Sequence, residues 1–487
     1  MSDTTTSPRR RERTFLGHPT QLGTLFGVEM WERFSFYGMQ GILLLYMYYS
    51  VAEGGLAIDQ GVAAGIVGAY GGTVYLSTIV AAWVADRLLG PERVLFGSAV
   101  AVMAGHIALA LLPGAAGLAV GLVLVALGSG GVKANASTIV ASLYGPGDDR
   151  RDAGFSIFYL GVNIGAFVGP LLTGLLQTTW GFHAGFGLAA VGMALGLTQY
   201  AINRRKLPAI GWTVPNPLPA AARTRVLLGA VAALAVIGVL VAAGIITADR
   251  LKWIVFGIVV VATVGYFSLM LTSPKVDRTE RRRVLAFLPM WVASAVFWAI
   301  FQQIFTVLTI YADERLDRSL FGWEMPVSWA QSIEPVFVIL LAGVYATVWT
   351  KLGPRQPSSP MKMAIGTVVV GLGFLLFVPF AGTGPNGTPL LALVVILLVF
   401  CLAELFTSPV GQSLSTKLAP RAFQTQMVAL FFLSVSMGTV CSGLLADYYS
   451  PEDEAAYFGV TGVAAIVVGA VVIALVPRLK VLMGGVR

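Results

Sequence analysis

The chain has 487 residues, of which 56% are hydrophobic and only 11% are charged, whereas soluble domains carry about 25% charged residues. This composition excludes an ordinary soluble protein and predicts an all-α integral membrane protein, because the long apolar runs suit helices better than the alternating strands of a barrel. The net charge of +8 does not indicate nucleic-acid binding, since the basic residues lie mostly in loops between apolar segments. Cys401 and Cys441 lie inside apolar runs and indicate packing rather than a disulfide.

The N-terminal tail is basic and contains Arg9, Arg10, Arg11 and Arg13. We do not expect a cleavable signal peptide after it, because the next apolar segment contains charged residues and lacks a small-residue cleavage site. We therefore expect the tail to be cytoplasmic and the first apolar segment to be retained as a membrane span.

Apolar segments of about 20 residues can cross a bilayer. The sequence predicts fourteen of them, near 22–49, 61–85, 94–112, 117–143, 154–176, 184–203, 226–247, 252–272, 284–312, 329–351, 361–380, 388–415, 425–448 and 456–476.

The fourteen spans divide as six, two and six. Spans 226–247 and 252–272 are rich in Val, Ala, Ile and Gly, have almost no polar residue at mid-depth, and resemble an inserted hairpin with no chemistry of its own. Two six-helix halves around a midplane site fit the general plan of secondary transporters. The predicted organisation is a cytoplasmic tail 1–20, an N-terminal six-helix bundle 21–205, a linker with the hairpin 206–280, a C-terminal six-helix bundle 281–480 and a cytoplasmic tail 481–487.

The basic residues are distributed unevenly between the two sides of the predicted membrane region. Of the 32 Lys and Arg, two lie within spans, Arg33 and Lys133, and only four lie on the side away from the N-terminus: Arg250, Lys252, Arg315 and Arg318. The other 26 lie in the tails and loops on the N-terminal side. This is the positive-inside pattern, so we expect both termini in the cytoplasm and contact between the basic loops and anionic lipid.

Glycines at regular spacing predict close packing between helices. Gly161, Gly165 and Gly169 recur every four residues in the fifth span, so another helix can approach this face closely. Most such glycines have a packing role, and a part in a rocking motion is compatible with the pattern.

The first span contains two carboxylates and a guanidinium, Glu29, Glu32 and Arg33. On a helix, Glu29, Arg33, Tyr37 and Gln40 share one face. Charges at membrane depth cost several kcal/mol each unless they are paired or face a water-filled cavity. The cluster therefore predicts a functional site rather than only a link between helices.

Six ionisable residues lie inside the predicted spans: Glu29, Glu32, Arg33, Lys133, Glu334 and Glu404. If all are ionised, they include four negative and two positive groups. Two ion pairs would leave two carboxylates, of which one could carry a proton and the other could meet an ammonium group of a substrate. This balance of charge suits a zwitterionic substrate.

Four segments resemble the proton-coupled oligopeptide transporter family, the peptide transporter branch of the major facilitator superfamily. Glu29 to Gly38 resembles its E-x-x-E-R-F-x-Y-Y-G pattern, and Gly71 to Arg93 resembles its second helix and the following loop. Phe158 to Gly165 resembles F-Y-x-x-x-N-x-G, and Glu404 to Gly411 resembles E-L-x-x-S-P-V-G. The resemblance implies the superfamily fold, two six-helix bundles plus an inserted two-helix hairpin.

The resemblance also implies roles for individual residues. Arg33 and Lys133 are expected to bind the terminal carboxylate of a peptide and Glu404 its terminal amine, while Glu29 and Glu32 exchange partners with the two cations as protons bind. The expected substrate-binding set is Arg33, Tyr37, Gln40, Tyr75, Lys133, Asn163, Trp298, Gln302, Glu334, Glu404 and Ser408, with proton coupling by Glu29, Glu32, Arg33, Lys133, Glu334 and Glu404. Asp86 and Arg87, with Arg93 after them, resemble the superfamily's cytoplasmic gating loop.

This chain departs from the family pattern at several positions. Gln302 stands where a carboxylate is usual, and Glu334 replaces the amide of a Q-S-x-N-P motif on the next helix. We hypothesise that the titratable group has moved from one helix to its neighbour. Phe36 replaces a tyrosine, Gln40 stands where a basic or amide side chain is common, and Phe431 stands where Trp is expected, which changes the donors of the pocket.

The leading interpretation is a monomeric, proton-coupled importer of di- and tripeptides in the inner cell membrane, with no cofactor besides protons. No metal spacing, phosphate-binding loop or nucleophile triad is visible, so neither an enzyme nor an ATP-driven pump is expected. His106 is expected to be a hydrogen-bonded packing residue. The alternatives are the same scaffold with another cargo (nitrate, an amino acid, a peptide-like drug or a metabolite, possibly exported) and a peptide-binding membrane receptor that does not transport.

Overall fold

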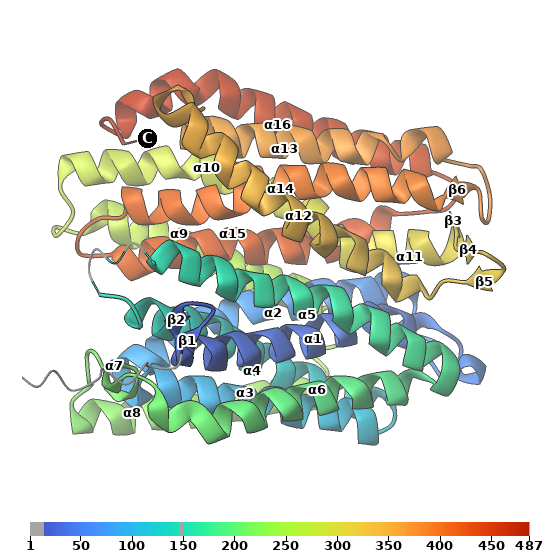
Figure 1. Ribbon diagram of the computed structural model, residues 1–487, viewed down its shortest axis with the longest axis horizontal. Helices are drawn as coiled ribbons and strands as arrows, with labels where there is room; N and C mark the ends of the chain where they lie inside the picture. The colour runs from blue at the N-terminus through green and yellow to red at the C-terminus, as the bar shows by residue number, and fades with distance from the viewer. Residues whose placement is uncertain (1–13, 146–147, 149, 487) are drawn as a thin grey trace, which may run out of the picture.

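The computed structural model describes residues 14–145, 148 and 150–486, so most of the predicted N-terminal tail lies outside the described residues. Long helices make up most of the fold (Figure 1). Their bounds are α1 Thr20–Tyr48, α2 Gln60–Val84, α3 Pro91–Leu111, α4 Gly114–Ser142, α5 Arg151–Trp180, α6 Phe182–Asn203, α7 Ala209–Trp212, α8 Ala220–Ala242, α9 Leu251–Thr272, α10 Arg278–Phe301, α11 Val307–Glu314, α12 Ile333–Leu352, α13 Ser359–Leu375, α14 Leu390–Leu418, α15 Gln424–Leu445 and α16 Glu454–Leu482.

Short elements complete the chain. One π-helical turn, η2 Ala85–Leu89, follows α2, and the 3-10 turns are η1 Val51–Glu53, η3 Arg204–Lys206, η4 Gln302–Phe305, η5 Val327–Ser332, η6 Gly353–Arg355, η7 Val378–Phe380 and η8 Ala446–Tyr448. Among the described residues, three two-residue strand pairs lie outside the long helices: β1 Thr14–Phe15 with β2 His18–Pro19, β3 Leu316–Asp317 with β6 Thr388–Pro389, and β4 Ser319–Leu320 with β5 Trp323–Glu324.

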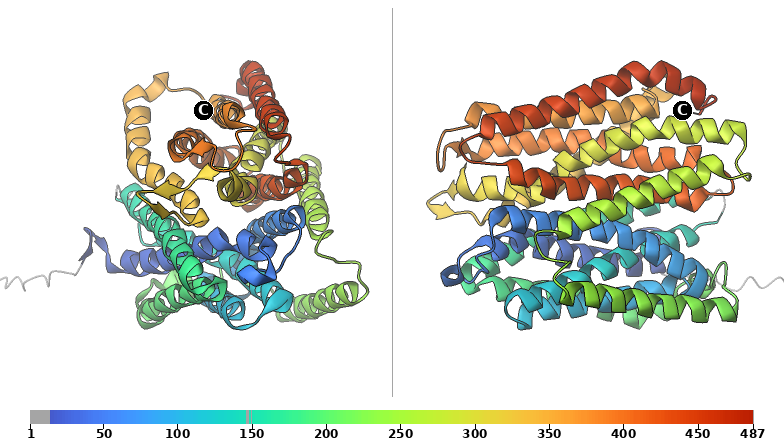
Figure 2. Two further views of the ribbon diagram at one scale, coloured as in Figure 1. Left: turned by 90° about the vertical axis from the view of Figure 1, so that its right-hand side faces the viewer. Right: turned by 180° about the vertical axis from the view of Figure 1, so that it is seen from behind.

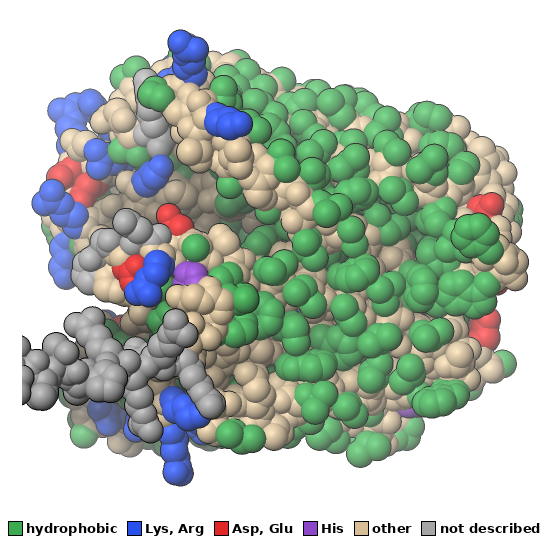
Figure 3. All heavy atoms as spheres, in the orientation of Figure 1, with side chains coloured by type: hydrophobic (Ala, Val, Ile, Leu, Met, Phe, Trp, Pro, Cys, Tyr) green, Lys and Arg blue, Asp and Glu red, His purple; other side chains and the backbone are tan. Residues whose placement is uncertain are grey.

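Within the described residues, thirteen helical segments are long and apolar enough to cross a membrane. The 29-residue helix α1 is the remaining predicted span, and it carries the charged residues Glu29, Glu32 and Arg33. The expected all-α membrane fold is therefore confirmed. Figure 3 shows a broad apolar surface between one end where Lys and Arg gather, which we call the basic end, and the opposite end.

The first six long helices form one bundle and α10 to α16 form the other, seen end-on in Figure 2. In the first bundle α1 packs against α5 and α6, and α3 packs against α4; in the second, α13 packs against α14 and α16. Of the inserted hairpin, α8 has no buried residue, whereas α9 packs against both α2 and α15.

The predicted span at 284–312 lies within one candidate membrane-spanning segment, Arg278–Glu314, but that segment is not one regular helix. After α10, the chain continues as η4 and restarts as α11, with the break at Thr306, whose φ and ψ are −122° and −102°. The next predicted span also begins irregularly, because η5 precedes α12. Pro335 lies in the first turn of α12, where its missing N–H leaves no intrahelical hydrogen bond unmade. Both irregular segments lie beside the central cavity.

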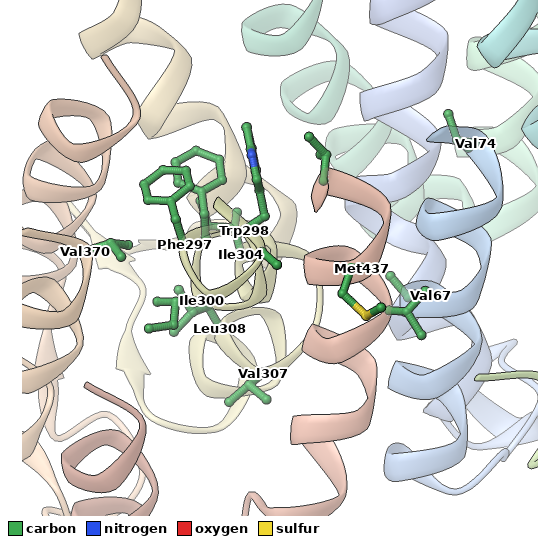
Figure 4. Packing of buried hydrophobic residues seen from close by; sticks show 14 of the residues in the cluster. Val67, Val74, Phe297, Trp298, Ile300, Ile304, Val307, Leu308, Val370 and Met437 are labelled. Carbon is green, nitrogen blue, oxygen red and sulfur yellow. The ribbon is translucent and has the colours of Figure 1, made fainter. Parts of the chain in front are cut away.

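The two bundles are joined at the end opposite the basic end. The hydroxyls of Tyr48 and Tyr49 donate to Asp313 at 2.5 and 2.8 Å, and Gln60 donates to Glu314 at 2.8 Å. Trp329 Nε1 also donates to a carbonyl of α5 at 2.9 Å. In the core, Val67 of α2 and Met437 of α15 point toward one another (Figure 4). These contacts close this end of the molecule.

Candidate functional site

A cavity of about 520 Å³ lies between the two bundles. Its walls come from α1, α2, α4 and α5 of the first bundle and from α10, η4, η5, α12, α14 and α15 of the second. Ser137 and Thr138 near the end of α4, Gln412 of α14 and Thr425 at the start of α15 extend the lining toward the basic end. Since the opposite end is closed, the cavity faces the basic end.

The glycine stripe of α5 positions the charged face of α1. A Cβ atom on Gly165 would lie 2.3 Å from the carbonyl oxygen of Met30 and 2.8 Å from Arg33 Cβ. A Cβ atom on Gly169 would lie 2.4 Å from the carbonyl oxygen of Phe34. The predicted close approach at this stripe is confirmed. It sets α1 against α5 at the level of the Arg33 guanidinium.

The first-span cluster forms a compact, buried ion group. Arg33 Nε donates to Glu29 Oε1 at 2.9 Å and lies 3.3 Å from Glu32 Oε2. All three side chains are at most 4% exposed. Arg33 Nη2 and Glu29 Oε2 have no hydrogen-bond partner among the described residues. The guanidinium therefore keeps an unsatisfied donor at Nη2, which is itself shielded from solvent, and Glu29 and Arg33 both line the cavity.

Lys133 contributes the second cation to the same side of the cavity. It comes from α4 and its Nζ lies 4.4 Å from the ring centroid of Tyr75, which belongs to α2. An ammonium over an aromatic face is attracted by the quadrupole of the ring, and this contact leaves its N–H groups available. Lys133 and Arg33 thus place two cations on the first bundle's wall, beside the carboxylates of Glu29 and Glu32.

Two carboxylates stand on the opposite wall. Glu334 lies in the first turn of α12 and Glu404 in the middle of α14, and both line the cavity. One turn away, Val338 packs with Cys401 and Leu405, which holds the two helices together at this level. The two carboxyl groups interact, and Glu334 Oε1 is buried with no hydrogen-bond partner among the described residues.

Two of the departures from the family pattern lie at the irregular segments. Gln302 is the first residue of η4 and Glu334 the second residue of α12, and both line the cavity. Between them, Gln331 donates to Thr309 Oγ1 at 2.9 Å, while its Oε1 has no described partner. The amide and the carboxylate thus face one space although they come from different helices.

Most residues predicted for the site come together in this one cavity: Glu29, Arg33, Tyr37, Tyr75, Lys133, Asn163, Trp298, Gln302, Glu334, Glu404 and Ser408. Glu32 lies behind the wall, fully buried against Arg33. Gln40 is buried and is not part of the cavity lining in this conformation, so its contact with substrate stays a prediction. Near its level, Gly38 and Gly41 pack tightly on α5 and η5, where the bundles close.

Several lining residues were not predicted. Tyr159, Phe301, Phe305 and Phe431 add aromatic surface, and Phe305 stacks on Tyr37 with ring centroids 5.9 Å apart. Tyr159 lies within the fifth-span motif and Phe431 was noted only as a replaced Trp, so the sequence held a signal for both. The sequence held no such signal for Phe305, because it is the break after α10 that directs this side chain into the cavity.

The predicted cytoplasmic gating residues lie at the basic end, outside the cavity. Arg87 Nε lies 3.4 Å from Asp86 Oδ2, and Asp86 Oδ1 accepts a hydrogen bond from Asn216 of the linker at 2.8 Å. Arg93 donates to the carbonyl oxygen of Leu89 at 3.3 Å. The pair Asp86 and Arg87 thus binds the linker in this conformation.

Two further features concern His106 and the possible metal ligands. His106 is fully buried as expected, but both ring nitrogens lack a partner among the described residues, so the expected hydrogen bond is absent there. Among the described residues, no group of three or more His, Cys, Asp or Glu side chains is arranged to hold a metal ion.

Comparison with known proteins gives consistent matches. Residues 92–462 match the family model of the POT family. The chain is 41% identical to "Uncharacterized transporter YclF" of Bacillus subtilis (strain 168) over 98% of this chain and 97% of that protein. It is 39% identical to "Di-/tripeptide transporter" of Lactococcus lactis subsp. cremoris over 98% of this chain and 99% of that protein.

A solved structure of similar shape is that of a peptide transporter POT, a glutamate-to-glutamine mutant in complex with alafosfalin. It superimposes with a TM-score of 0.92 at 45% identity, over 97% of this chain and 98% of that chain. The fold is therefore that of the major facilitator superfamily. With a family match over most of its length and relatives this similar end to end, the chain belongs to the POT family.

Proposed function

We propose that this protein is a proton-coupled symporter that imports di- and tripeptides by alternating access. It works as a monomer in the inner cell membrane, with both termini in the cytoplasm, protons as the coupling ion and no covalent chemistry. The gathering of Lys and Arg at one end supports this orientation. The relative named as a di-/tripeptide transporter, 39% identical over nearly the whole chain, supports the cargo.

The observation that carries the proposal is the separation of charge across one cavity. Arg33 and Lys133 stand on the wall of the first bundle, and Glu334 and Glu404 stand on the wall of the second. A zwitterionic peptide lying across the cavity would place its carboxylate and its ammonium against opposite walls. The volume of about 520 Å³ suits a small ligand.

Each wall has defined tasks in this proposal. The guanidinium of Arg33 and the ammonium of Lys133 bind the terminal carboxylate of the peptide. Glu404 binds the terminal ammonium. The hydrogen-bonding contacts to the rest of the peptide and the walls of its side-chain pockets come from Tyr37, Tyr75, Asn163, Trp298, Gln302 and Ser408.

The coupling proton is held by the carboxyl pair Glu334 and Glu404. Two interacting carboxylates in a site of low dielectric cannot both be charged without a large cost, so one proton shared between them stabilises the empty cavity. Glu29 and Glu32 then exchange partners with Arg33 and Lys133 as protons bind. The Asp86 and Arg87 loop stabilises the opposite, outward-facing conformation.

The proton gradient supplies enough free energy for this task. Moving one charge inward across about 100 mV gives roughly 2.3 kcal/mol, and one pH unit adds about 1.4 kcal/mol. The sum of ~3.7 kcal/mol supports on the order of 500-fold accumulation of a neutral zwitterion per proton.

The experiment that tests the proposal is uptake of a labelled dipeptide into proteoliposomes under an imposed pH gradient. We expect saturable uptake that collapses with an uncoupler and is competed by unlabelled di- and tripeptides but not by nitrate. Proton-driven uptake of nitrate with no uptake of the dipeptide would assign the scaffold to an anion. Peptide binding without accumulation under any gradient would assign it to a receptor.

A further inference from the structure

The inserted hairpin carries one buried cation, Lys252, at the closed end of the molecule. Helix α9 lies along the boundary between the bundles, in contact with α2 on one side and α15 on the other (Figure 2). Its buried residues form one stripe that begins with Lys252, only 6% exposed, and continues with Val255 and Val259.

Lys252 forms an ion pair across two elements. Its Nζ donates to both oxygens of Asp447, with distances of 2.5 and 2.6 Å. Asp447 belongs to η8, which follows α15 directly, so this bond links the hairpin to the second bundle. The pair lies at the end opposite the basic end.

The same lysine also fills a notch in the first bundle. A Cβ atom on Gly65 of α2 would lie 2.7 Å from Lys252 Cδ, and one on Gly61 would lie 3.2 Å from Asp447 Oδ1. One turn along, a Cβ atom on Gly68 would lie 2.8 Å from Gly443 Cα, so α2 and α15 touch through their backbones. The ion pair therefore sits on the seam between the bundles.

We propose that Lys252 is a positioning residue of the transport cycle: paired with Asp447 and seated on Gly65, it stabilises the closed seam between α2 and α15. This inference rests on the alternating access of the proposed function. Opening this end separates α2 from α15 and removes the pair from the glycine notch. Lys252 is buried whereas Asp447 is 36% exposed, so loss of Asp447 leaves a poorly solvated charge at the closed seam and favours the open seam.

The test is the distance between spin labels at this end of the molecule. Ala52→Cys after α1 and Glu452→Cys after α15 provide exposed sites on the two bundles, in a background with Cys401→Ser and Cys441→Ser. We expect Asp447→Asn, which leaves the buried lysine without its partner, to raise the ratio of long to short distances about tenfold or more, the size expected for loss of a charged hydrogen bond. Lys252→Met leaves only a solvated carboxylate and is expected to raise the ratio less. The double variant, which leaves no charge unpaired, is expected to return toward the parent ratio.

A matched control removes a charge without removing a bond. Asp453→Asn changes an exposed carboxylate close to Asp447 and is expected to leave the distances unchanged. Gly65→Ala keeps both charges but displaces the lysine, so it is expected to shift the ratio in the same direction. If Lys252→Met does not yield folded protein, Gly65→Ala serves as the test variant in its place. Distances that do not move in either variant, or that move equally in Asp453→Asn, would overturn the inference.

The spin-label measurement needs no substrate, so the two proposals fail separately. If the distances shift but the parent protein accumulates no peptide, the cargo is wrong and the role of Lys252 stands. If peptide uptake proceeds and the distances do not shift, the role of Lys252 alone is wrong.

Discussion

Arg33 donates its Nε–H to Glu29 at 2.9 Å while its Nη2, equally buried, has no partner among the described residues. A guanidinium binds a carboxylate best through two parallel N–H groups, and a lysine in its place keeps the charge but loses that fork. We predict that Arg33→Lys raises the KM for dipeptide uptake about tenfold or more. The measurement is initial uptake rate against dipeptide concentration in proteoliposomes.

The control for this prediction is a dipeptide with a C-terminal amide. Because it lacks the carboxylate that Arg33 binds, its affinity as a competitor should be low in the parent protein and nearly unchanged by Arg33→Lys. An equal loss for the free acid and the amide would show that Arg33 acts by holding α1 in place instead.

Glu334 and Gln302 face the same cavity from neighbouring irregular segments. We predict that Glu334→Gln abolishes proton-driven accumulation but leaves counterflow exchange, because exchange of peptide for peptide needs no net proton movement. Restoring a carboxylate on the other segment should restore coupling, so the double variant Glu334→Gln with Gln302→Glu is expected to accumulate peptide again. Accumulation by Glu334→Gln alone would exclude Glu334 as the proton carrier.

Much of this site can be predicted from the sequence because helical periodicity fixes the direction in which each side chain points from its helix. The four-residue spacing of Glu29 and Arg33 placed both on one face, and both line the cavity. The regular glycines of the fifth span predicted the close contact with α1. In an apolar segment, charges and small residues are rare enough that their spacing is informative.

The rest depends on tertiary packing that a single segment does not encode. The apolar run 284–312 reads as one helix, yet it breaks at Thr306 and turns Phe305 into the cavity. Lys252 reads as a loop residue at the end of a span, and only the meeting of α2, α9 and α15 shows it to be buried. Gln40 has the periodicity of the cavity face but lies where the bundles close.

Glu404 distinguishes a zwitterionic cargo from a simple anion. We predict that Glu404→Gln lowers the affinity for dipeptides with a free amine about tenfold or more, since it removes the charged partner of the ammonium. Competition by N-acetylated dipeptides should change little. If uptake of the free peptide is unaffected by Glu404→Gln, the ammonium does not bind at this wall, and an anionic cargo becomes the better interpretation.

The contact between α5 and α1 at Gly165 positions Arg33 on the wall of the cavity. A single methyl group added at Gly165 should therefore destabilise the fold and disturb the site. A Cβ atom would lie 2.3 Å from the Met30 carbonyl oxygen and 2.7 Å from the backbone nitrogen of Phe34. Since the obstacles are backbone atoms, the helices must move apart, which typically costs about 1–3 kcal/mol. We predict that Gly165→Ala lowers the melting temperature in detergent and raises the KM for dipeptide.

The matched control is Gly229→Ala in α8, where a Cβ atom meets nothing within 4 Å. Both variants gain the same helix propensity, so any difference between them comes from packing. The melting temperature can be followed with a thiol-reactive dye, because Cys401 is buried and Cys441 is partly buried until the protein unfolds. A Gly165→Ala variant as stable and as active as Gly229→Ala would mean that α1 is held at its level by contacts other than the glycine stripe of α5.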